Sequence, residues 1–405
     1  MLNNKKRDFT PFDMKKHPSN QNLFIMPLVW GASYIMTRQF GLKIKKENMQ
    51  GLKPPYLVYS THQGFSDYYI APLALFPHRA NYVSDMEGFA AFGEGLYRSL
   101  GCIGKRRFEP DVSVIMNIRY AIKKGRSVVI FPESRHSNIG TTARIPKNLG
   151  RLAKMLGVNV LVLSAHGSYL ANPFWDEERT RKTKMEATLR CICRADELHN
   201  VDSDELQSRI EQFLDYDEYA WQQHASVKIK EKFRAEGIHK PLYICHTCGS
   251  EYYMKSNGDT LYCEKCGAKW ILSEDGMLIG HNETIDAPKW YEWQKSFAIG
   301  KIKQAGNLEY SVRVEALPNS KGFISMGQGK LLLNDKEFTL LLDNEILHFS
   351  HAVRESVQTE YNYRGRGMCI VLSSRDCCYY IYSDDINFNP TEIQFIGEYL
   401  YDETS

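Results

Sequence analysis

The sequence has few cysteines and no long hydrophobic run, and each shortage excludes a class of protein. Ten cysteines in 405 residues are too few for the disulfide framework of small secreted domains. No apolar run approaches the ~18–20 residues that a membrane-spanning helix requires. The formal net charge is only +3 at pH 7, which argues against a dedicated nucleic-acid-binding protein. The cysteine usage favours a reducing, cytoplasmic compartment.

The overall composition is that of a globular protein, but its charge is unevenly distributed. Hydrophobic residues make up 43% and charged residues 24% of the chain, and its length allows two to four domains. Residues 101–154 contain twelve Lys or Arg against three acidic residues, whereas residues 195–218 contain nine acidic residues against one arginine. The basic block indicates either an anionic ligand or a solvated surface.

Residues 54 to 170 alternate short apolar runs with amphipathic stretches. The runs 54–61, 127–131 and 158–165 are rich in Val, Leu and Ile without strict alternation, which predicts buried strands. Residues 111–124 and 145–156 have helical spacing of their apolar positions. Strands that alternate with helices predict an α/β domain with a largely parallel sheet. Ligands of such sheets bind beyond the carboxyl ends of the strands.

An apolar segment precedes this domain. Leu23–Met36 has only fourteen residues and is interrupted by Pro27 and Gly31, so it is too short to cross a bilayer. It suits a helix that either packs on the core or lies in one leaflet. The lysines within residues 43–46 would face anionic lipid headgroups in the second arrangement. The sequence therefore allows a peripheral association with the inner face of the membrane.

The second half of the chain differs from the first in its pattern of predicted helices and strands. We expect a charged helical stretch over residues 203–236 that Gly237 ends, and a short aromatic helix over residues 287–298. After residue 307, about seven short β-rich runs are separated by Asn and Asp turns. A capped helix begins near Asn389. We therefore expect three domains, over residues 1–237, 238–282 and 283–405.

The first chemical motif follows the predicted strand 54–61. His62 lies at the carboxyl end of that strand, and Asp67 follows five residues later. An imidazole with a pKa near ~6.5 can take up a proton at neutral pH, and a carboxylate on its other nitrogen fixes the tautomer and stabilises the imidazolium. Such a pair suits general-base activation of a substrate hydroxyl. By itself the spacing is weak, because a His and an Asp occur this far apart by chance.

Two further motifs follow in the chain. Residues 131–135 (FPESR) end the predicted strand 127–131, so Glu133 is expected at the same sheet edge as His62. There it would either bind an acceptor hydroxyl or orient Arg107 or Arg135. Residues 101–107 (GCIGKRR) combine glycines with three cations. Arginine can bind a phosphate with two hydrogen bonds, so this block favours an anion. The alternative for residues 131–135 is a turn with an incidental salt bridge, and residues 101–107 are a weak signal when taken alone.

In this order and spacing, the three motifs together resemble the glycerolipid acyltransferase superfamily, most closely its 1-acyl-sn-glycerol-3-phosphate acyltransferase branch. The resemblance covers about residues 20–220. Several positions depart from the pattern of the family, including Arg135 and His136, where threonine and arginine are common. Ser134 stands where the family has glycine, and Arg106 stands where an acidic residue often precedes the arginine. A proline that is usual in the fourth block is missing from 158–165.

The resemblance implies an O-acyltransferase that acts in phospholipid synthesis. His62 would remove the proton from the free hydroxyl of a lysophospholipid, and Asp67 would hold His62 in position. The lysophospholipid that the resemblance implies is 1-acyl-sn-glycerol-3-phosphate. The acyl donor would be an acyl thioester, either acyl-CoA or acyl carrier protein. The residues expected to bind the acceptor and its phosphate are Lys105, Arg107, Glu133, Ser134 and Arg135.

A cysteine-rich segment predicts a metal site. Cys245 and Cys248 form one CxxCG motif, and Cys263 and Cys266 form a second after fourteen residues. Two such knuckles can place four thiolates tetrahedrally around Zn²⁺, and four protein ligands make a closed, structural site. A segment of this size has almost no core, so the metal would be needed for its folding. We therefore predict a zinc ribbon with a structural zinc ion and expect no nucleic-acid partner.

The predicted strands and terminal helix of the C-terminal region resemble a pleckstrin-homology-like barrel. Arg364 and Arg366 are its only sequence indication of a headgroup site. A scaffolding role is the alternative. A similar alternative applies to the whole chain, because a non-catalytic membrane- or partner-binding protein built on an acyltransferase-like domain would carry the same three segments.

Overall fold

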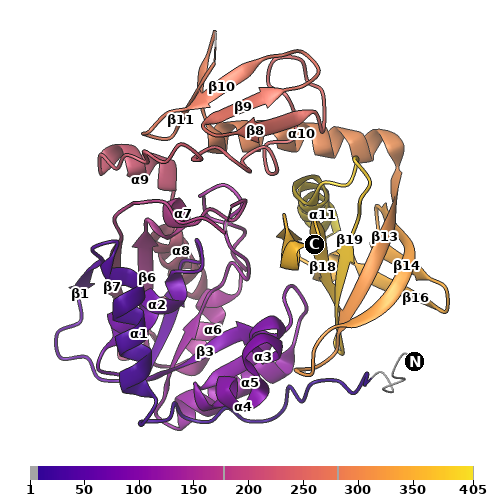
Figure 1. The fold of residues 1–405 in the computed structure, drawn as a ribbon. Helices are drawn as coiled ribbons and strands as arrows, with labels where there is room; N and C mark the ends of the chain where they lie inside the picture. Colours follow the sequence, from indigo (N-terminus) through magenta and orange to yellow (C-terminus); the bar gives the residue numbers. More distant parts are fainter. Residues whose placement is uncertain (1–7, 177, 281, 405) are drawn as a thin grey trace. The chain divides into compact units, whose positions relative to one another are not determined.

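A computed structural model describes residues 8–176, 178–280 and 282–404. The chain forms two compact units. The first, the α/β unit, consists of Asn20–Tyr82 and Ala121–Gly300. The second, the C-terminal unit, consists of the residues up to Ser19, Val83–Tyr120 and the residues from Lys301 onward. Figure 1 labels the helices and strands of both.

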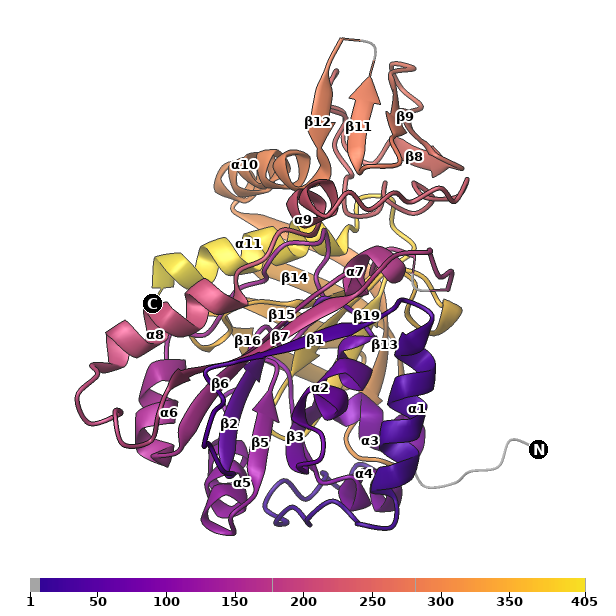
Figure 2. The ribbon, with the colours of Figure 1, turned by 90° about the vertical axis from the view of Figure 1, so that its left-hand side faces the viewer.

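The α/β unit contains a mixed, mostly parallel sheet, which confirms the expected α/β architecture. Its strands lie in the order β1-β7-β6-β2-β5-β3, and only the pair β6/β7 is antiparallel. Figure 2 shows these strands side by side. Strand β3 continues into the C-terminal unit, where β4 follows it in the sheet order. The bounds are β1 Lys43–Glu47, β2 Tyr56–Ser60, β3 Ala80–Asp85, β4 Cys102–Lys105, β5 Ser127–Ile130, β6 Asn159–His166 and β7 Glu186–Cys193.

The three apolar runs chosen from the sequence form β2, β5 and β6, the strands at the centre of the sheet. Strand β2 is buried along its whole length, as a central strand covered on both faces should be. The sequence did not single out β1, β3, β4 or β7. Strand β1 (KIKKE) is a lysine-rich edge strand, and β7 alternates buried with half-buried residues.

Helices alternate with the strands along the chain. Two of them, α5 and α10, continue from one unit into the other. The predicted charged helical stretch 203–236 is wrong beyond Leu214, because Asp217 caps a separate short helix, α9, through the amides of Tyr219 and Ala220. The bounds are α1 Met26–Arg38, α2 Asp67–Leu75, α3 Met86–Phe92, α4 Glu94–Ser99, α5 Val112–Lys123, α6 Leu149–Leu156, α7 Ser168–Ala171, α8 Ser203–Leu214, α9 Glu218–His224 and α10 Ala287–Ala305.

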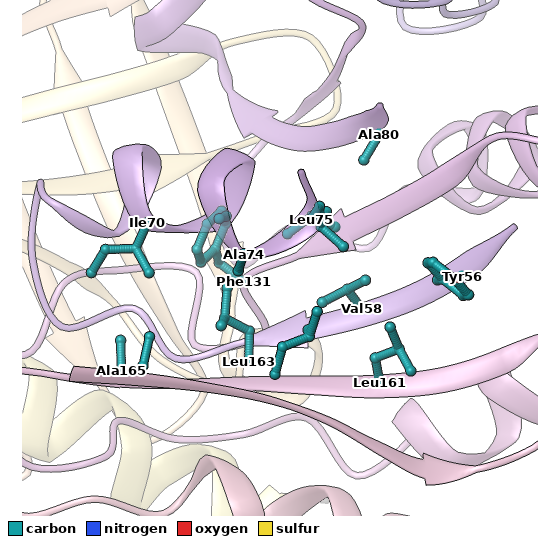
Figure 3. Packing of buried hydrophobic residues seen from close by; sticks show 14 of the residues in the cluster. Tyr56, Val58, Ile70, Ala74, Leu75, Ala80, Phe131, Leu161, Leu163 and Ala165 are labelled. Atoms are coloured by element: carbon teal, nitrogen blue, oxygen red, sulfur yellow. The ribbon is translucent and has the colours of Figure 1, made fainter. Parts of the chain in front are cut away.

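Side chains from the central strands and from α2 form the core of the α/β unit. Figure 3 shows Val58 of β2 and Leu161 of β6 on the side of the sheet where Ile70 of α2 lies. Phe131, the residue after β5, is part of the same cluster. The His62 and Glu133 motifs therefore follow directly from strands that are held rigidly by apolar packing. None of the helices in the described ranges combines the length and apolar character needed to cross a membrane.

The cysteine-rich segment of the α/β unit forms a small antiparallel sheet. Its five strands lie in the order β12-β11-β10-β9-β8. One face is buried through Leu261, Trp270 and Leu278, and Trp270 meets Trp290 of α10 edge-on with ring centroids 4.8 Å apart. The bounds are β8 Met254–Asn257, β9 Thr260–Cys263, β10 Lys269–Leu272, β11 Met277–Gly280 and β12 Thr284–Asp286.

The C-terminal unit contains a seven-stranded antiparallel sheet with the shape of a half-barrel, called the C-terminal sheet below. Its order is β16-β15-β14-β13-β19-β18-β17. Two runs expected as separate strands, 322–326 and 330–334, form the single strand β14. Asn389 caps α11 as expected, because its Oδ1 accepts from the Thr391 amide at 2.9 Å. The bounds are β13 Asn307–Leu317, β14 Ile324–Asn334, β15 Glu337–Leu342, β16 Glu345–Ser350, β17 Gln358–Glu360, β18 Cys369–Ser373, β19 Cys378–Tyr382 and α11 Pro390–Thr404.

The C-terminal sheet shares its apolar core with the segment Val83–Tyr120. One apolar cluster contains Met86 and Phe89 of α3, Cys102 of β4, and residues of the C-terminal sheet such as Val371 and Tyr380. Packing therefore associates α3, α4 and β4 with the C-terminal sheet.

Candidate active site and metal centre

His62 lies on the loop that joins β2 to α2, and Asp67 is the first residue of α2. The side chains are 5% and 1% exposed, and His62 Nδ1 lies 3.7 Å from Asp67 Oδ2. That distance is longer than a hydrogen bond but within the range of an ion pair, as in many unliganded catalytic pairs. Gly64 closes the loop by donating its amide to Asp67 Oδ2 at 3.0 Å. A Cβ atom on Gly64 would lie 3.3 Å from the Ser168 carbonyl, so the close approach favours glycine.

Aromatic rings surround the His62 imidazole. Phe131 and His136 have ring centroids 4.6 Å and 4.5 Å from it. The Tyr68 hydroxyl lies 3.3 Å from His62 Nε2, the nitrogen that faces away from Asp67. A hydroxyl group therefore already stands at hydrogen-bonding distance from the nitrogen that would act as the base.

Glu133 fixes the backbone of the same loop. Its Oε1 accepts from the His62 amide at 2.8 Å. Its Oε2 accepts from the Ala143 amide at 2.8 Å and from the Tyr216 hydroxyl at 3.0 Å. All three donors belong to the protein, and Glu133 is buried. In this arrangement the carboxylate positions His62 through its main chain.

Burial perturbs both carboxylates of the site. It raises the pKa of Asp67 to about 6, while the Gly64 amide opposes this shift. It raises the pKa of Glu133 to about 7, against hydrogen bonds from the Ala143 and His62 amides. Perturbed titratable groups beside one histidine at the carboxyl end of a strand are typical of catalytic sites.

The other residues expected in the site divide between the two units. Ser134 and Arg135 follow Glu133 in the α/β unit, and Arg135 is buried with Nη1 3.4 Å from the His136 carbonyl. Ser134 has a φ of 57°, in the left-handed region that favours glycine. This explains in physical terms why glycine suits the position. Lys105 and Arg107 belong to the C-terminal unit.

Three residues near His62 were missed by sequence reasoning as contributors to the site. His136 is close to FPESR but matched no motif of its own. Tyr68 is the second residue of α2, and Tyr216 lies in the acidic segment far along the chain. The positions of Tyr68 and His136, each directly after a motif, offered a sequence signal, whereas Tyr216 offered none.

A hollow of about 290 Å³ opens beside the segment between β2 and α2. Phe65 and Ser66, which lie between His62 and Asp67 in the sequence, form part of its wall, and Met36 and Gln39 come from the end of α1. The volume is close to the ~300 Å³ lower limit of common ligand pockets. Its complete lining is Met36, Gln39, Phe40, Phe65, Ser66, Tyr69, Asn172 and Thr180.

The four cysteines of the small sheet form a cluster that could hold a metal. Their sulfur atoms lie within 4.8 Å of one another, with Cys245 and Cys266 3.6 Å apart and Cys248 and Cys263 3.9 Å apart. Four thiolates at ~2.3 Å from a tetrahedral Zn²⁺ would be about 3.8 Å apart, so this donor set fits zinc.

The two CxxCG motifs have the same backbone geometry. The Gly249 amide donates to the Cys245 carbonyl at 2.8 Å, and the Gly267 amide donates to the Cys263 carbonyl at 2.9 Å. Both glycines have positive φ angles, of 66° and 77°. His246, between the first two cysteines, pairs instead with Glu283, with Nδ1 2.8 Å from Oε2.

The two arginines considered as a headgroup site face an acidic partner within the C-terminal unit. Arg364 Nη1 lies 3.1 Å from Glu315 Oε2, and Arg366 Nη1 lies 2.5 Å from Glu315 Oε1. Arg364 also lies over the Phe323 ring, 4.1 Å from its centroid. Both guanidinium groups therefore already have a carboxylate partner.

Comparison with known proteins supports the resemblance over part of the chain. The family model described as Acyltransferase matches residues 42–165, which include β2, the His62–Asp67 loop and Glu133. No curated protein matches the chain. A solved structure, the 1-acyl-sn-glycerophosphate acyltransferase of Thermotoga maritima, is similar with a TM-score of 0.39 and 18% identity, over 47% of this chain and 77% of that one. The chain thus contains an acyltransferase-like segment over residues 42–165.

Proposed function

We propose that this protein is an O-acyltransferase that transfers an acyl group from an acyl thioester to the free hydroxyl of a lysophospholipid. The observation that carries the proposal is the His62–Asp67 pair, which lies beyond the carboxyl end of β2 inside the segment that matches the acyltransferase model. Acyl-CoA and acyl carrier protein are the two candidate donors. The acceptor implied by the resemblance is 1-acyl-sn-glycerol-3-phosphate.

In the proposed reaction, His62 Nε2 takes the proton of the acceptor hydroxyl as that oxygen attacks the thioester carbonyl carbon. The carbon–sulfur bond then breaks, the new ester forms, and the imidazolium returns the proton to the departing thiolate. Asp67 stabilises the imidazolium from the Nδ1 side, and Glu133 holds the His62 main chain. Direct transfer of this kind needs no covalent acyl-enzyme.

The raised pKa of Asp67 predicts an acidic limit to activity. Only the ionised carboxylate stabilises the imidazolium, and burial sets its pKa to about 6. We therefore expect kcat/KM to fall about tenfold per pH unit below that value, because the neutral acid predominates there. A profile of kcat/KM from about pH 5 to pH 8 measures this, and a flat profile over the range would refute the role of Asp67.

Helix α1 supports a peripheral association with a membrane. Its inward side carries Met26, Ser33 and Thr37, and the Thr37 hydroxyl donates to the Ser33 carbonyl at 2.8 Å. Its opposite side carries Leu28 and Ile35, which are 72% and 59% exposed. A helix with small polar residues inside and large apolar residues outside suits insertion into one leaflet. We place this surface at the cytoplasmic face of the membrane.

The double variant Leu28→Ser/Ile35→Ser is expected to weaken binding to phosphatidylglycerol-containing vesicles by at least about tenfold, because each buried methylene contributes ~0.8 kcal/mol. Sedimentation with vesicles measures the partition. Ile386→Ser, at an isoleucine 66% exposed in the C-terminal unit, is the matched control and should bind like the wild type. Equal binding by all three proteins would contradict insertion of α1.

The domains follow from the same proposal. We assign an acyltransferase-like domain to residues 1–237, a zinc ribbon to 238–282 and a pleckstrin-homology-like domain to 283–405. Seven antiparallel strands followed by α11 support the last assignment. The paired state of Arg364 and Arg366 favours a scaffolding role for this domain over headgroup binding.

A non-catalytic binding protein is the second candidate, and the low exposure of His62 favours it. The side chain is only 5% exposed, and Tyr68 occupies its Nε2 side. Consumption of acyl-CoA in the presence of lysophosphatidate separates the two candidates. A panel of acceptors with and without phosphate, offered with acyl-CoA and acyl carrier protein in turn, then identifies both substrates. No turnover with any pair would refute the enzyme.

A further inference from the structure

Arg107, the arginine expected to bind the acceptor phosphate, is surrounded by carboxylates within the C-terminal unit. Its side chain is 14% exposed, and its Nη2 forms a short ion pair with Asp85 Oδ2. Its Nη1 lies 3.7 Å from Glu87 Oε1 and also 3.7 Å from Glu360 Oε1. Three acidic side chains therefore share one guanidinium group.

This environment opposes the binding of a phosphate. The three carboxyl groups outnumber the single guanidinium that they contact, and a phosphate monoester would bring about two further negative charges. Like charges at this range cost binding energy in a partly desolvated site. The contacts at 3.7 Å are too long for hydrogen bonds, and Nη1 donates none to the described residues. A phosphate oxygen could use these donors if a carboxylate were absent.

Glu360 differs from the other two carboxylates in its origin. Asp85 caps α3 by accepting from the Gly88 amide, and Glu87 accepts from the Tyr380 hydroxyl at 2.6 Å. Glu360 belongs to β17, an edge strand of the C-terminal sheet. Its Oε1 accepts from Gln358 Nε2 at 2.7 Å, a bond that a glutamine oxygen at position 360 could also accept.

The loop that carries Arg107 is also bound to the C-terminal sheet by its main chain and neighbours. Arg106 Nη2 donates to the Asp376 carbonyl at 3.2 Å, and Arg354 Nη1 donates to the Phe108 carbonyl at 3.3 Å. The Arg354 guanidinium further lies 3.5 Å from Glu109 Oε2. Glu360 is thus presented to Arg107 by a surface that is already anchored to the residues on both sides of it.

We propose that Glu360 is a specificity-determining residue, supplied by the C-terminal sheet, whose carboxylate competes with the acceptor phosphate for Arg107. The inference rests on the proposed function and on the expectation from the sequence that Arg107 binds the acceptor phosphate. Glu360 lowers the affinity for phosphorylated acceptors relative to unphosphorylated ones.

Binding measured without an acyl donor tests this proposal separately from acyl transfer. A short-chain, monomeric lysophosphatidate and the matching monoacylglycerol are titrated into the full chain by calorimetry. We expect Glu360→Gln to bind the phosphorylated ligand about tenfold more tightly and the unphosphorylated ligand within about twofold of the wild type. Glu360→Asp, which keeps the charge, should stay within a few-fold of the wild type for both. Thermal unfolding verifies that each variant is folded.

Arg107→Ala provides the second arm. If Glu360 acts through Arg107, adding Glu360→Gln to Arg107→Ala changes nothing, whereas an independent effect of Glu360 would persist. The proposal is overturned if Glu360→Gln leaves lysophosphatidate binding unchanged or weaker, if its gain persists without Arg107, or if no variant binds the ligand. Tighter binding without any acyl transfer would refute the proposed enzyme and leave the role of Glu360 intact.

Discussion

Replacement of His62 by alanine is expected to lower kcat of acyl transfer by about 10²–10⁴-fold, because it removes the general base. His62 lies in a loop beyond the end of β2, so the sheet should keep its packing and the variant should remain folded. Steady-state turnover of acyl-CoA with lysophosphatidate gives the rate. Thermal unfolding gives the stability of the same preparation, which separates lost chemistry from lost structure.

Two variants make this result specific. His62→Gln fills more of the space between Phe131 and His136 than alanine does, yet it has no group that titrates near neutral pH. It should be as inactive as His62→Ala. His199→Ala, at an exposed histidine of the α/β unit, should retain full activity. Turnover by His62→Ala within a few-fold of the wild type would end the assignment of His62 as the base.

Asp67→Asn should be severely impaired for a related reason. The amide can still accept from the Gly64 amide, so the loop should keep its shape, but it cannot stabilise an imidazolium. Any activity that remains should lose the contribution of Asp67 to the acidic limb, so that the limb follows the protonation of His62 alone. A difference between the pH profiles of the wild type and Asp67→Asn is therefore assigned to this residue and not to loss of folding.

The parts of the site that the sequence predicted are those fixed by short-range structure. Apolar runs identified β2 and β5, and the carboxyl ends of neighbouring parallel strands meet at one edge of a sheet. The order of motifs along the chain therefore suffices to place His62 and Glu133 together. The 2.8 Å contact between the His62 amide and Glu133 is the direct consequence of this topology.

The parts that escaped prediction depend on contacts between distant segments. Tyr216 reaches Glu133 from a segment that the sequence predicted to be one long helix. The break at Leu214 has a local cause, the cap formed by Asp217, but the helical composition of the stretch concealed it. The carboxylate neighbours of Arg107 were also out of reach, because Glu360 comes from a strand about 250 residues later in the chain.

The association of residues 83–120 with the C-terminal sheet has the same origin. Met86 and Phe89 lie in a stretch whose apolar pattern is compatible with packing on either unit. Local periodicity specifies that a face is buried but not what covers it. The packing of that face on Val371 and Tyr380 determines which unit it belongs to. A single sequence contains no signal for such long-range packing.

Removal of the metal is expected to have the largest structural effect. We expect one zinc ion per chain, bound by Cys245, Cys248, Cys263 and Cys266. Structural zinc supplies an apparent ~10–16 kcal/mol of folding free energy to zinc-finger peptides, far more than a five-stranded sheet of this size gains from its own core. Chelation or Cys263→Ser should therefore unfold the small sheet. Metal analysis and hydrogen exchange across residues 243–286 measure the two effects.

The control is a cysteine outside the cluster. Cys191→Ser changes a buried thiol of β7, so it should cost some stability but leave the zinc content at one per chain. The loss of order in Cys263→Ser should extend to the contacts that hold the sheet in the α/β unit. These include the bond from Gln222 Nε2 to the Glu274 carbonyl at 3.0 Å and the packing of Trp270 on Trp290.

Four protein thiolates would leave the metal no open coordination position, so the ion could not polarise a carbonyl or activate water. Replacement of zinc by cadmium, which thiolates also bind, should therefore preserve kcat of acyl transfer as long as the small sheet stays folded. Two results would contradict this role: a purified full-length chain without stoichiometric zinc, or a cadmium-loaded chain that is folded but inactive. The second result would mean that the metal takes part in the reaction, which the closed set of ligands argues against.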